Sequence, residues 1–304
     1  MLVPKQQVDL ASYLESWTIH LQAERKSPAT IRSYLEGVRQ FLDWCPTGQR
    51  VGQLDRRTVN AFVAAKFAEG AEPNTVRARQ MALKRYSAWL ADPDGGDVLE
   101  RDELVGLKPP KLDTKVVPSL TDDQLHALVG VCRGHSLVDR RDEAIIRLMA
   151  ETGTRAGEVV NMTMADVDLV GGRATVRRGK GGKGRTVPIS PQCARAVDRY
   201  LRLRRTHRLA DTDALWLGGR GKAFTYAALY RTLKWRADQA GIKGFRPHLL
   251  RHTAASRWLA AGGSEGGLMA VAGWSRREML DRYTRATSEA RAADEARRLG
   301  LGDL

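Results

Sequence analysis

Two consecutive prolines stand in the stretch Lys108-Pro109-Pro110-Lys111-Leu112-Asp113-Thr114-Lys115. Proline removes a backbone hydrogen-bond donor and favours extended structure, so this stretch is typical of a linker. Shortly after it comes Thr121-Asp122-Asp123-Gln124, a capping-box sequence that predicts the first turn of a helix. At 304 residues the chain is long for a single hydrophobic core. We therefore expect two domains, residues 1–108 and 119–304, with a linker at residues 109–118.

The N-terminal domain carries apolar residues at the spacing of amphipathic helices. One predicted face holds Leu10, Tyr13, Leu14, Trp17 and Leu21, and another holds Val59, Phe62, Val63 and Phe67. The segment Ser27-Pro28-Ala29-Thr30-Ile31-Arg32 recurs as Glu72-Pro73-Asn74-Thr75-Val76-Arg77, which indicates two similar helical hairpins. We expect four helices in this domain.

The C-terminal domain mixes helices with strands. Ala174-Thr175-Val176 and Thr186-Val187-Pro188-Ile189 have the composition of strands, and we expect a small antiparallel sheet around residues 166–190. Helices are predicted at about 191–209 and 224–240, and another begins at Pro247. Residues 288–299 favour a helix but carry few large apolar side chains, so we expect a tail helix that docks elsewhere. The predicted fold is mainly α, with a helical first domain and an α+β second domain.

Charge points to the partner. The chain carries 50 Lys and Arg residues against 35 Asp and Glu, a formal charge of +15. Such a surplus favours polyanions, nucleic acid above all, with a mildly basic enzyme as the alternative. The sequence has no apolar run long enough for a membrane span and no signal-peptide region at its start, so we expect a cytoplasmic protein with no membrane partner. The three cysteines, Cys45, Cys132 and Cys193, lack metal-ligand spacing, which favours buried thiols and no metal site.

The second domain contains the side-chain types that can cut a phosphodiester without a metal. A phenolic oxygen can attack phosphorus in line, and negative charge then gathers on two non-bridging oxygens that need fixed cationic donors. Arginine offers planar N–H groups that match phosphate oxygens, whereas lysine is a point charge able to give up a proton. The residue types predict these roles: attack by Tyr283, phosphate clamping by Arg155 and Arg251, leaving-group protonation by Lys180, and hydrogen bonding with proton transfer by His248.

The sequence around these residues resembles that of the tyrosine recombinases, the phage integrase and Xer-like family. Residues 151–158, Glu-Thr-Gly-Thr-Arg-Ala-Gly-Glu, are similar to the family's box TG-x-R-x-x-E and contain Arg155 and Glu158. Residues 246–253, Arg-Pro-His-Leu-Leu-Arg-His-Thr, are similar to its H-x-x-R-H box. Gly273-Trp274 and the later Tyr283 are spaced as in its final box. The boxes stand in the family's order from about residue 120 to the end of the chain.

Two departures from the family bear on the chemistry. Trp274 occupies a position that is often histidine, and an indole can donate a hydrogen bond but cannot titrate. Arg285 stands where the family often has a histidine after the nucleophile, so that group is absent here. We expect Trp274 to stabilise charge at the site and Glu158 to orient Arg155 from three positions away.

The general acid has two candidates in Gly179-Lys180-Gly181-Gly182-Lys183-Gly184-Arg185-Thr186. This segment comes close to a phosphate-binding P-loop, but position 185 is Arg and the flanks indicate two strands rather than a strand and a helix. A glycine-rich hairpin tip fits better, and the resemblance places the general acid on such a hairpin. Lys180 is the first choice for the general acid, and Lys183 is the alternative. If Lys180 is not the acid, it would belong to a basic loop that binds backbone phosphates, and Lys183 is expected to bind DNA as well.

Arg32 and Arg77 stand near two predicted helix starts in the first domain. A helix start presents free N–H groups and a positive dipole end, so we hypothesise that both positions bind DNA phosphates. The structural alternative is that Pro-x-Thr is a good helix start without any ligand.

The resemblance implies a metal-independent, site-specific DNA recombinase without a cofactor, acting through a 3′-phosphotyrosyl intermediate. Its first domain would be a SAM-like core-binding domain, and no arm-binding domain is expected before it. The implied partners are double-stranded attachment sites, further copies of the chain in a tetramer on DNA, linked through the tail helix, and an accessory directionality factor. Integration and excision by a phage or mobile element is the first choice. Xer-like dimer resolution, a type IB topoisomerase-like enzyme and a non-catalytic DNA-binding regulator remain as alternatives.

Overall fold

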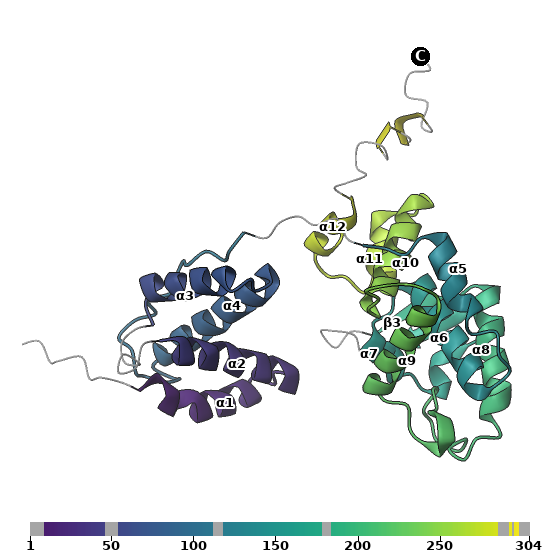
Figure 1. Cartoon of the computed structure of the whole chain (residues 1–304), viewed down its shortest axis with the longest axis horizontal. Helices are drawn as coiled ribbons and strands as arrows, with labels where there is room; N and C mark the ends of the chain where they lie inside the picture. The colour runs from purple at the N-terminus through teal and green to yellow at the C-terminus, as the bar shows by residue number, and fades with distance from the viewer. Residues whose placement is uncertain are drawn as a thin grey trace, which may run out of the picture. The chain divides into compact units, whose positions relative to one another are not determined.

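The computed structural model describes residues 9–45, 54–111, 118–177, 184–284, 292–293 and 295–297. The chain divides into two compact units, Met1–Asp113 and Thr114–Leu304 (Figure 1). Each unit has a hydrophobic core of its own. Residues 112–117 of the predicted linker lie outside the described residues.

The N-terminal unit is a bundle of helices that begin where the sequence provides caps. It comprises the 3₁₀ turn η1 (Leu10–Tyr13) and the helices α1 (Leu14–Ala23), α2 (Pro28–Trp44), α3 (Arg56–Ala68) and α4 (Pro73–Leu90). The Ser27 side chain accepts a hydrogen bond from the Thr30 backbone at the start of α2, and the Asp55 side chain does the same for Thr58 at the start of α3. The four predicted helices are therefore confirmed.

Aromatic side chains fill the core of this unit. The ring of Trp17 lies 6.0 Å from that of Tyr34 and 4.8 Å from that of Tyr86. The hydroxyl of the buried Tyr86 donates to the backbone carbonyl of Leu10, which joins α4 to η1. One prediction is wrong: Phe67 is 39% exposed, because the buried face of α3 runs through Val59 and Phe62 and the last turn extends beyond the core.

The C-terminal unit is the α+β domain that the sequence predicts. Its first half contains α5 (Asp122–Gly130), α6 (Leu137–Thr152), α7 (Ala156–Val160), η2 (Met164–Asp166) and the strands β1 (Val167–Asp168), β2 (Arg173–Val176) and β3 (Arg185–Pro188). The strands form an antiparallel sheet in the order β1-β2-β3, with Ala174 opposite both Val167 and Val187. The sheet expected around residues 166–190 is confirmed.

The second half of this unit is helical. It contains α8 (Pro191–Arg204), η3 (Gly219–Gly221), α9 (Tyr226–Gln239), α10 (His248–Ala260), α11 (Glu265–Ala272), η4 (Arg277–Met279) and α12 (Asp281–Thr284). α8 ends five residues before the predicted limit of 209, in a turn region. Most of the predicted tail helix, residues 288–299, lies outside the described residues.

Helix α6 runs through the middle of the C-terminal core. It packs against α8 and α10, and its residues Ile145, Ile146 and Met149 are buried. A capping box formed by Ser136 and Asp139 begins the helix. Gly153 ends it with a φ of 64°, a left-handed conformation that glycine adopts without steric cost.

Two long-range polar contacts fasten other elements to this core. The buried guanidinium of Arg236, on α9, donates to Asp142 at 2.9 Å and to Asp139 at 2.7 Å, and both carboxylates belong to α6. Near the start of the unit, the Leu120 backbone N–H donates to Oγ1 of Thr253 on α10 at 2.8 Å, across 133 positions of sequence. The first contact joins α9 to α6, and the second joins the start of the unit to α10.

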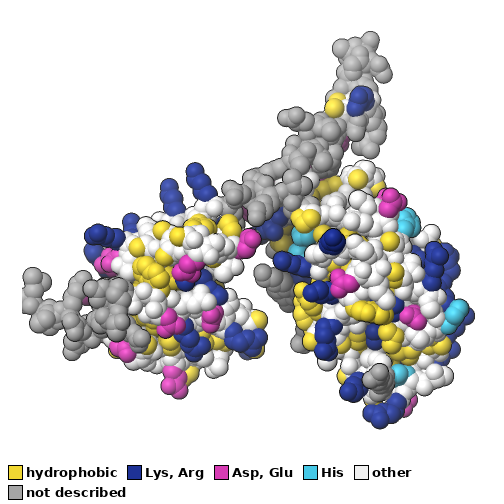
Figure 2. Space-filling model, viewed as in Figure 1, with side chains coloured by type: hydrophobic (Ala, Val, Ile, Leu, Met, Phe, Trp, Pro, Cys, Tyr) yellow, Lys and Arg dark blue, Asp and Glu magenta, His cyan; other side chains and the backbone are white. Residues whose placement is uncertain are grey.

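The surface of both units carries many cations. Figure 2 shows Lys and Arg side chains spread over the visible face of each unit, among hydrophobic and acidic ones. None of the described helices has the length and apolar composition needed to cross a membrane.

Candidate active site

Helix α10 carries the candidates His248 and Arg251 on one face, together with His252. Pro247 precedes it, as the sequence predicts, and His248 is its first residue. Residues separated by three or four positions share a helix face, so His248, Arg251 and His252 lie side by side. The opposite face, which includes Leu250, is buried in the protein. Packing of that apolar face fixes where the three polar side chains lie.

Arg251 is buried and ties three elements together. Its Nη1 donates to the carbonyl of Gly153 at 2.6 Å, and its Nη2 donates to the carbonyl of Ala272 at 2.8 Å. Its guanidinium carbon lies 5.2 Å from the centre of the Trp274 ring. Burial, and then the charge of Arg155, lower the pKa of Arg251 to about 10, so the group stays a cation at neutral pH.

Glu158 holds two arginines with one carboxylate. Arg155 donates to it from Nη1 at 2.7 Å and from its backbone N–H at 2.8 Å. Arg185, on β3, donates to both oxygens, at 3.1 and 2.8 Å, and its Nε donates to the carbonyl of Val271 at 2.7 Å. Burial would raise the pKa of Glu158, but the hydrogen bonds from Arg185 and Arg155 outweigh it and leave the pKa below its ordinary value. The predicted contact between Glu158 and Arg155 is present.

A cavity of about 560 Å³ opens between α7, α9 and α10. It brings together Arg155, His248 and Arg251, which the sequence carries in two separate boxes. Side chains that the sequence interpretation did not single out complete its lining: Asn161, Tyr226, Tyr230 and Arg246. Tyr226 and Tyr230 are both exposed and stand four positions apart on α9, so they form one aromatic wall.

Tyr283 lies on the short helix α12. Its ring stacks on Trp274, with ring centres 5.3 Å apart and planes 20° apart. Its hydroxyl is hydrogen-bonded to Nδ1 of His252, whose ring centre lies 4.4 Å from that of His248. Burial raises the pKa of Tyr283 to about 12, so the phenol is protonated at neutral pH. A chain of aromatic contacts thus joins Tyr283, through His252, to a side chain that lines the cavity.

The indole N–H of Trp274 is a hydrogen-bond donor without an acceptor among the described residues. Only 6% of the residue is exposed. A buried N–H without a partner costs about 1–3 kcal/mol, so this donor is available to an acceptor that enters the site. Gly273, in the left-handed region with a φ of 64°, ends α11 directly before Trp274.

Four other residues are predicted to act on DNA: Lys180, Lys183, Arg32 and Arg77. Lys180 and Lys183 fall outside the described residues, although the strands that flank them pair, with Val176 opposite Arg185. Arg32 and Arg77 belong to the N-terminal unit, where both are exposed near the starts of α2 and α4.

Sequence interpretation missed Arg185 and the contact of His252. Arg185 could have been suspected, since it is the first residue of the strand after the glycine-rich segment. The contact of His252 with Tyr283 has no sequence signal beyond the second histidine of its box.

The cysteines and acidic residues form no second site in the described part of the chain. Cys45, Cys132 and Cys193 are buried, and burial raises the pKa of both Cys132 and Cys193 to about 12. Among the described residues, no three His, Cys, Asp or Glu side chains are grouped so that they could hold a metal ion.

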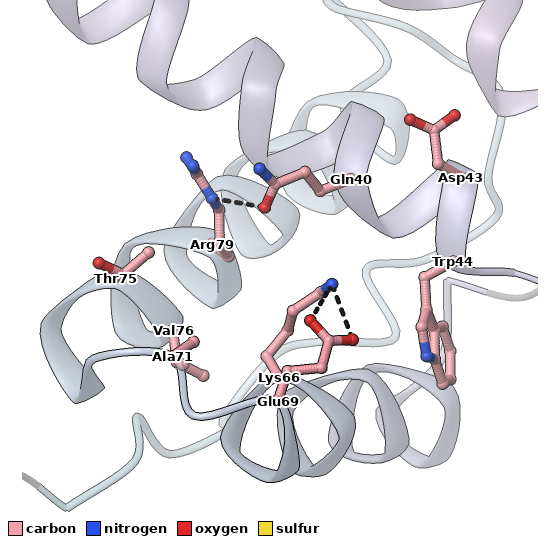
Figure 3. Close-up of a pocket in the computed structure, with 9 residues that line it drawn as sticks. All are labelled: Gln40, Asp43, Trp44, Lys66, Glu69, Ala71, Thr75, Val76 and Arg79. Carbon is pink, nitrogen blue, oxygen red and sulfur yellow. Dashed lines mark hydrogen bonds and ion pairs between the residues drawn. The ribbon is translucent and has the colours of Figure 1, made fainter.

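The N-terminal unit has a cavity of its own, of about 450 Å³, between α2, α3 and α4. Its two cationic side chains are bonded within the unit, Lys66 to Glu69 and Arg79 to Gln40 (Figure 3). Trp44 closes one side. This lining holds two carboxylates, Asp43 and Glu69, beside its two cations.

Comparison with protein families gives two matches. A model of the phage integrase family matches residues 118–290, and a model of the phage integrase N-terminal SAM-like domain matches residues 14–96. Among curated proteins, tyrosine recombinase XerC of Roseiflexus sp. (strain RS-1) is 31% identical over 258 residues, which cover 82% of this chain and 81% of the relative. Tyrosine recombinase XerA of Pyrococcus furiosus is 31% identical over 281 residues, which cover 91% and 90%.

Solved structures show a similar fold. The crystal structure of XerA recombinase matches with a TM-score of 0.51 and 27% identity, over 90% of this chain and 93% of that one. The Tn1549 transposon integrase in complex with transposon right end DNA matches with a TM-score of 0.75 and 18% identity, over 94% and 98%. XerH site-specific recombinase bound to a palindromic difH substrate matches with a TM-score of 0.72 and 18% identity, over 94% and 84%.

Proposed function

Because the chain belongs to the phage integrase family and is a tyrosine-type site-specific recombinase, we propose that Tyr283 is its nucleophile. The single observation that carries this proposal is convergence. Arg155, at the start of α7, lines one cavity with His248 and Arg251 of α10. Tyr283 lies against Trp274 and against His252, and the His252 ring contacts that of His248. The contacts of Arg251 and Glu158 with backbone and side chains hold the cations in place before any ligand arrives, which is what transition-state stabilisation requires.

The proposed ligand of the cavity is one phosphodiester of double-stranded DNA. Arg155 and Arg251 bind its non-bridging oxygens, and the free Nε1–H of Trp274 supplies a further donor. His248, which lines the cavity, donates a hydrogen bond to the same phosphate. Burial, with the charges of Arg251 and Arg155, lowers the pKa of His248. It is therefore a neutral hydrogen-bond donor at neutral pH.

The proposed reaction exchanges one ester for another. Oη of Tyr283 forms a bond to phosphorus while the bond from phosphorus to the 5′-oxygen breaks. Lys180, or Lys183 as the alternative, protonates the departing oxygen. The products are a 3′-phosphotyrosyl link and a free 5′-hydroxyl. A 5′-hydroxyl of a second duplex then attacks the link and releases Tyr283, so no cofactor is consumed.

The remaining assignments are proposals of the same kind. We assign residues 1–108 to a core-binding domain, 109–118 to a linker and 119–304 to the catalytic domain with a tail helix. Arg32 and Arg77 bind backbone phosphates. The active assembly is a tetramer on DNA in the cytoplasm, aided by an accessory directionality factor. The role is integration and excision of a phage or mobile element.

Dimer resolution of the Xer type is a second candidate role, because the curated relatives described above carry the names XerC and XerA. Recombination on plasmids separates the two roles. Integration predicts joining between two unlike sites, whereas resolution predicts exchange between two copies of one site in direct repeat.

Covalent capture tests the nucleophile. Sheared genomic DNA from the organism that encodes the protein is incubated with it, and the DNA that stays linked after denaturation is sequenced at its junctions. A nicked suicide duplex built on the recovered sequence should give a covalent adduct with the wild-type protein. Tyr283→Phe should bind the same duplex with similar affinity and give no adduct. An adduct that persists in Tyr283→Phe would show that another residue attacks.

A further inference from the structure

His252 contacts the hydroxyl of Tyr283, the oxygen that would attack phosphorus. Its Nδ1 is hydrogen-bonded to the hydroxyl of Tyr283, and the two ring centres are 5.5 Å apart. Because the phenol is protonated, its O–H donates and Nδ1 accepts. The proton of the imidazole therefore sits on Nε2 in this state. His248 is the other histidine of the site, and its side chain lines the phosphate cavity.

We propose that His252 is the general base that takes the proton of Tyr283 during strand cleavage. This inference rests on the proposed function of the site. As the bond between Oη of Tyr283 and phosphorus forms, the phenolic proton moves to Nδ1 of His252. The bond between phosphorus and the 5′-oxygen breaks, and that oxygen takes a proton from the lysine. In the reverse step His252 returns its proton to Tyr283.

The geometry divides the work between two histidines. His248 and His252 meet edge to face, with planes 85° apart, so their rings point in different directions. The His248 ring reaches the cavity, while His252 reaches the nucleophile. Each ring thus serves one of the two reacting groups. A single histidine that served both would have to move between them.

The surroundings of His252 keep it ready to accept. Burial, followed by the neighbouring His248, Arg251 and Arg282, lowers the pKa of His252 to about 4, so the ring is neutral above about pH 5. Trp274, which stacks on Tyr283, adds no charge. Negative charge develops on the phosphate in the transition state and stabilises the protonated form of His252 nearby. The basicity of the His252 ring is therefore higher when the proton is transferred.

The pH dependence of the cleavage rate shows whether His252 takes a proton or only positions Tyr283. We propose single-turnover cleavage of the nicked suicide duplex by the wild type, His252→Phe and His252→Asn. The wild-type rate should stay level between about pH 6 and 9, since its base is neutral throughout. Without a base only ionised tyrosine attacks, so the rate of His252→Phe should be about a hundredfold or more lower at pH 7 and should rise about tenfold with each pH unit.

His252→Asn separates proton transfer from positioning. Its amide oxygen can accept a hydrogen bond from Tyr283 but cannot take a proton, so its profile should follow that of His252→Phe. A level profile in either variant would overturn the proposal. His126→Phe is the matched control, because His126 is an exposed residue of α5 and its replacement should leave rate and profile unchanged. Thermal melting of all variants shows whether each is folded.

A modified duplex identifies the half of the reaction that is affected. Sulfur in place of the bridging 5′-oxygen leaves as a thiolate and needs no proton from an acid. The defect of His252→Phe should remain on this duplex, because its cause is the nucleophile. Restoration to the wild-type rate would place His252 on the leaving-group side and refute the assignment. If the wild type itself forms no adduct on any recovered DNA, it is the proposed function that fails.

Discussion

Glu158 shows how one buried carboxylate can organise a site. The carboxylate is 5% exposed and receives hydrogen bonds from the guanidinium groups of Arg155 and Arg185. Arg185 in turn reaches the carbonyl of Val271, two residues before the glycine that precedes Trp274. Glu158 therefore fixes both the first arginine of the cavity and the end of α11.

We expect Glu158→Gln to lower the free energy of unfolding by on the order of 3 kcal/mol at neutral pH, because it removes one partner of a buried ion pair. The effect should depend on pH. The folded-state pKa of Glu158 lies below its ordinary value of 4.5, so its stabilisation is present above pH 4.5 and is lost as the pH falls through the folded-state pKa. Denaturant unfolding of wild type and variant across the acid range measures this difference.

A solvent-exposed ion pair serves as the control. Asp168→Asn breaks the exposed contact between Asp168 and Arg173, and we expect little change in stability. Equal losses in both variants, or a Glu158→Gln loss that persists in acid, would contradict the role given to Glu158.

For single residues, the sequence predicts which side chains belong to the site better than it predicts their contacts. The boxes bring out Arg155, Glu158, His248 and Arg251, and the structure places all four in one group. The partnership of Glu158 with Arg185 spans 27 positions and depends on how β3 packs beside α11, which no local pattern encodes. The same is true of His252 and Tyr283, 31 positions apart.

Among the elements, α11 offers a direct test of backbone conformation. Gly273 ends it at a φ of 64°, and a Cβ there would come within 3.0 Å of the Arg185 guanidinium. Gly266 lies in the first turn of the same helix, where a Cβ would meet nothing within 4 Å. A side chain is therefore strained at Gly273 and has room at Gly266.

We expect Gly273→Ala to destabilise the protein by about 1–2 kcal/mol, since a side chain is strained in the left-handed region. Gly266→Ala should instead stabilise it by about 0.5–1 kcal/mol, because alanine loses less backbone entropy in a helix. Denaturant melts of the two variants check both signs. A neutral Gly273→Ala would show that α11 can end without its left-handed residue.

Elements with local signals are the ones that the sequence predicts well. The capping box at Thr121 begins α5, and Pro247 precedes α10, as expected. Ends are predicted less well: α8 stops at Arg204, where turns follow instead of the helix expected to 209. The burial of Phe67 was overestimated because helical spacing defines a face but not how far the neighbouring helices extend along it.

For the molecule as a whole, the surplus of cations predicts salt-sensitive DNA binding. Each phosphate contact that is lost should reduce the slope of log affinity against log salt concentration by about 0.9. We expect this reduction in both Arg32→Ala and Arg77→Ala, measured by titration of the recovered duplex at several salt concentrations. Arg101→Ala removes the same charge from an exposed side chain of the same unit that is paired with Glu103, and its slope should match the wild type. Unchanged slopes in the first two variants would remove the phosphate assignment.

The hydrogen bond between Leu120 and Thr253 has a consequence for synthesis on the ribosome. The N-terminal unit completes its core with Leu107, so it can fold while the rest of the chain is still being made. The C-terminal unit closes a contact over 133 positions and must await translation of α10. At about 5–20 residues per second, the nascent apolar segments of that unit stay uncovered for on the order of ten seconds. We expect chaperones to bind these segments during this interval.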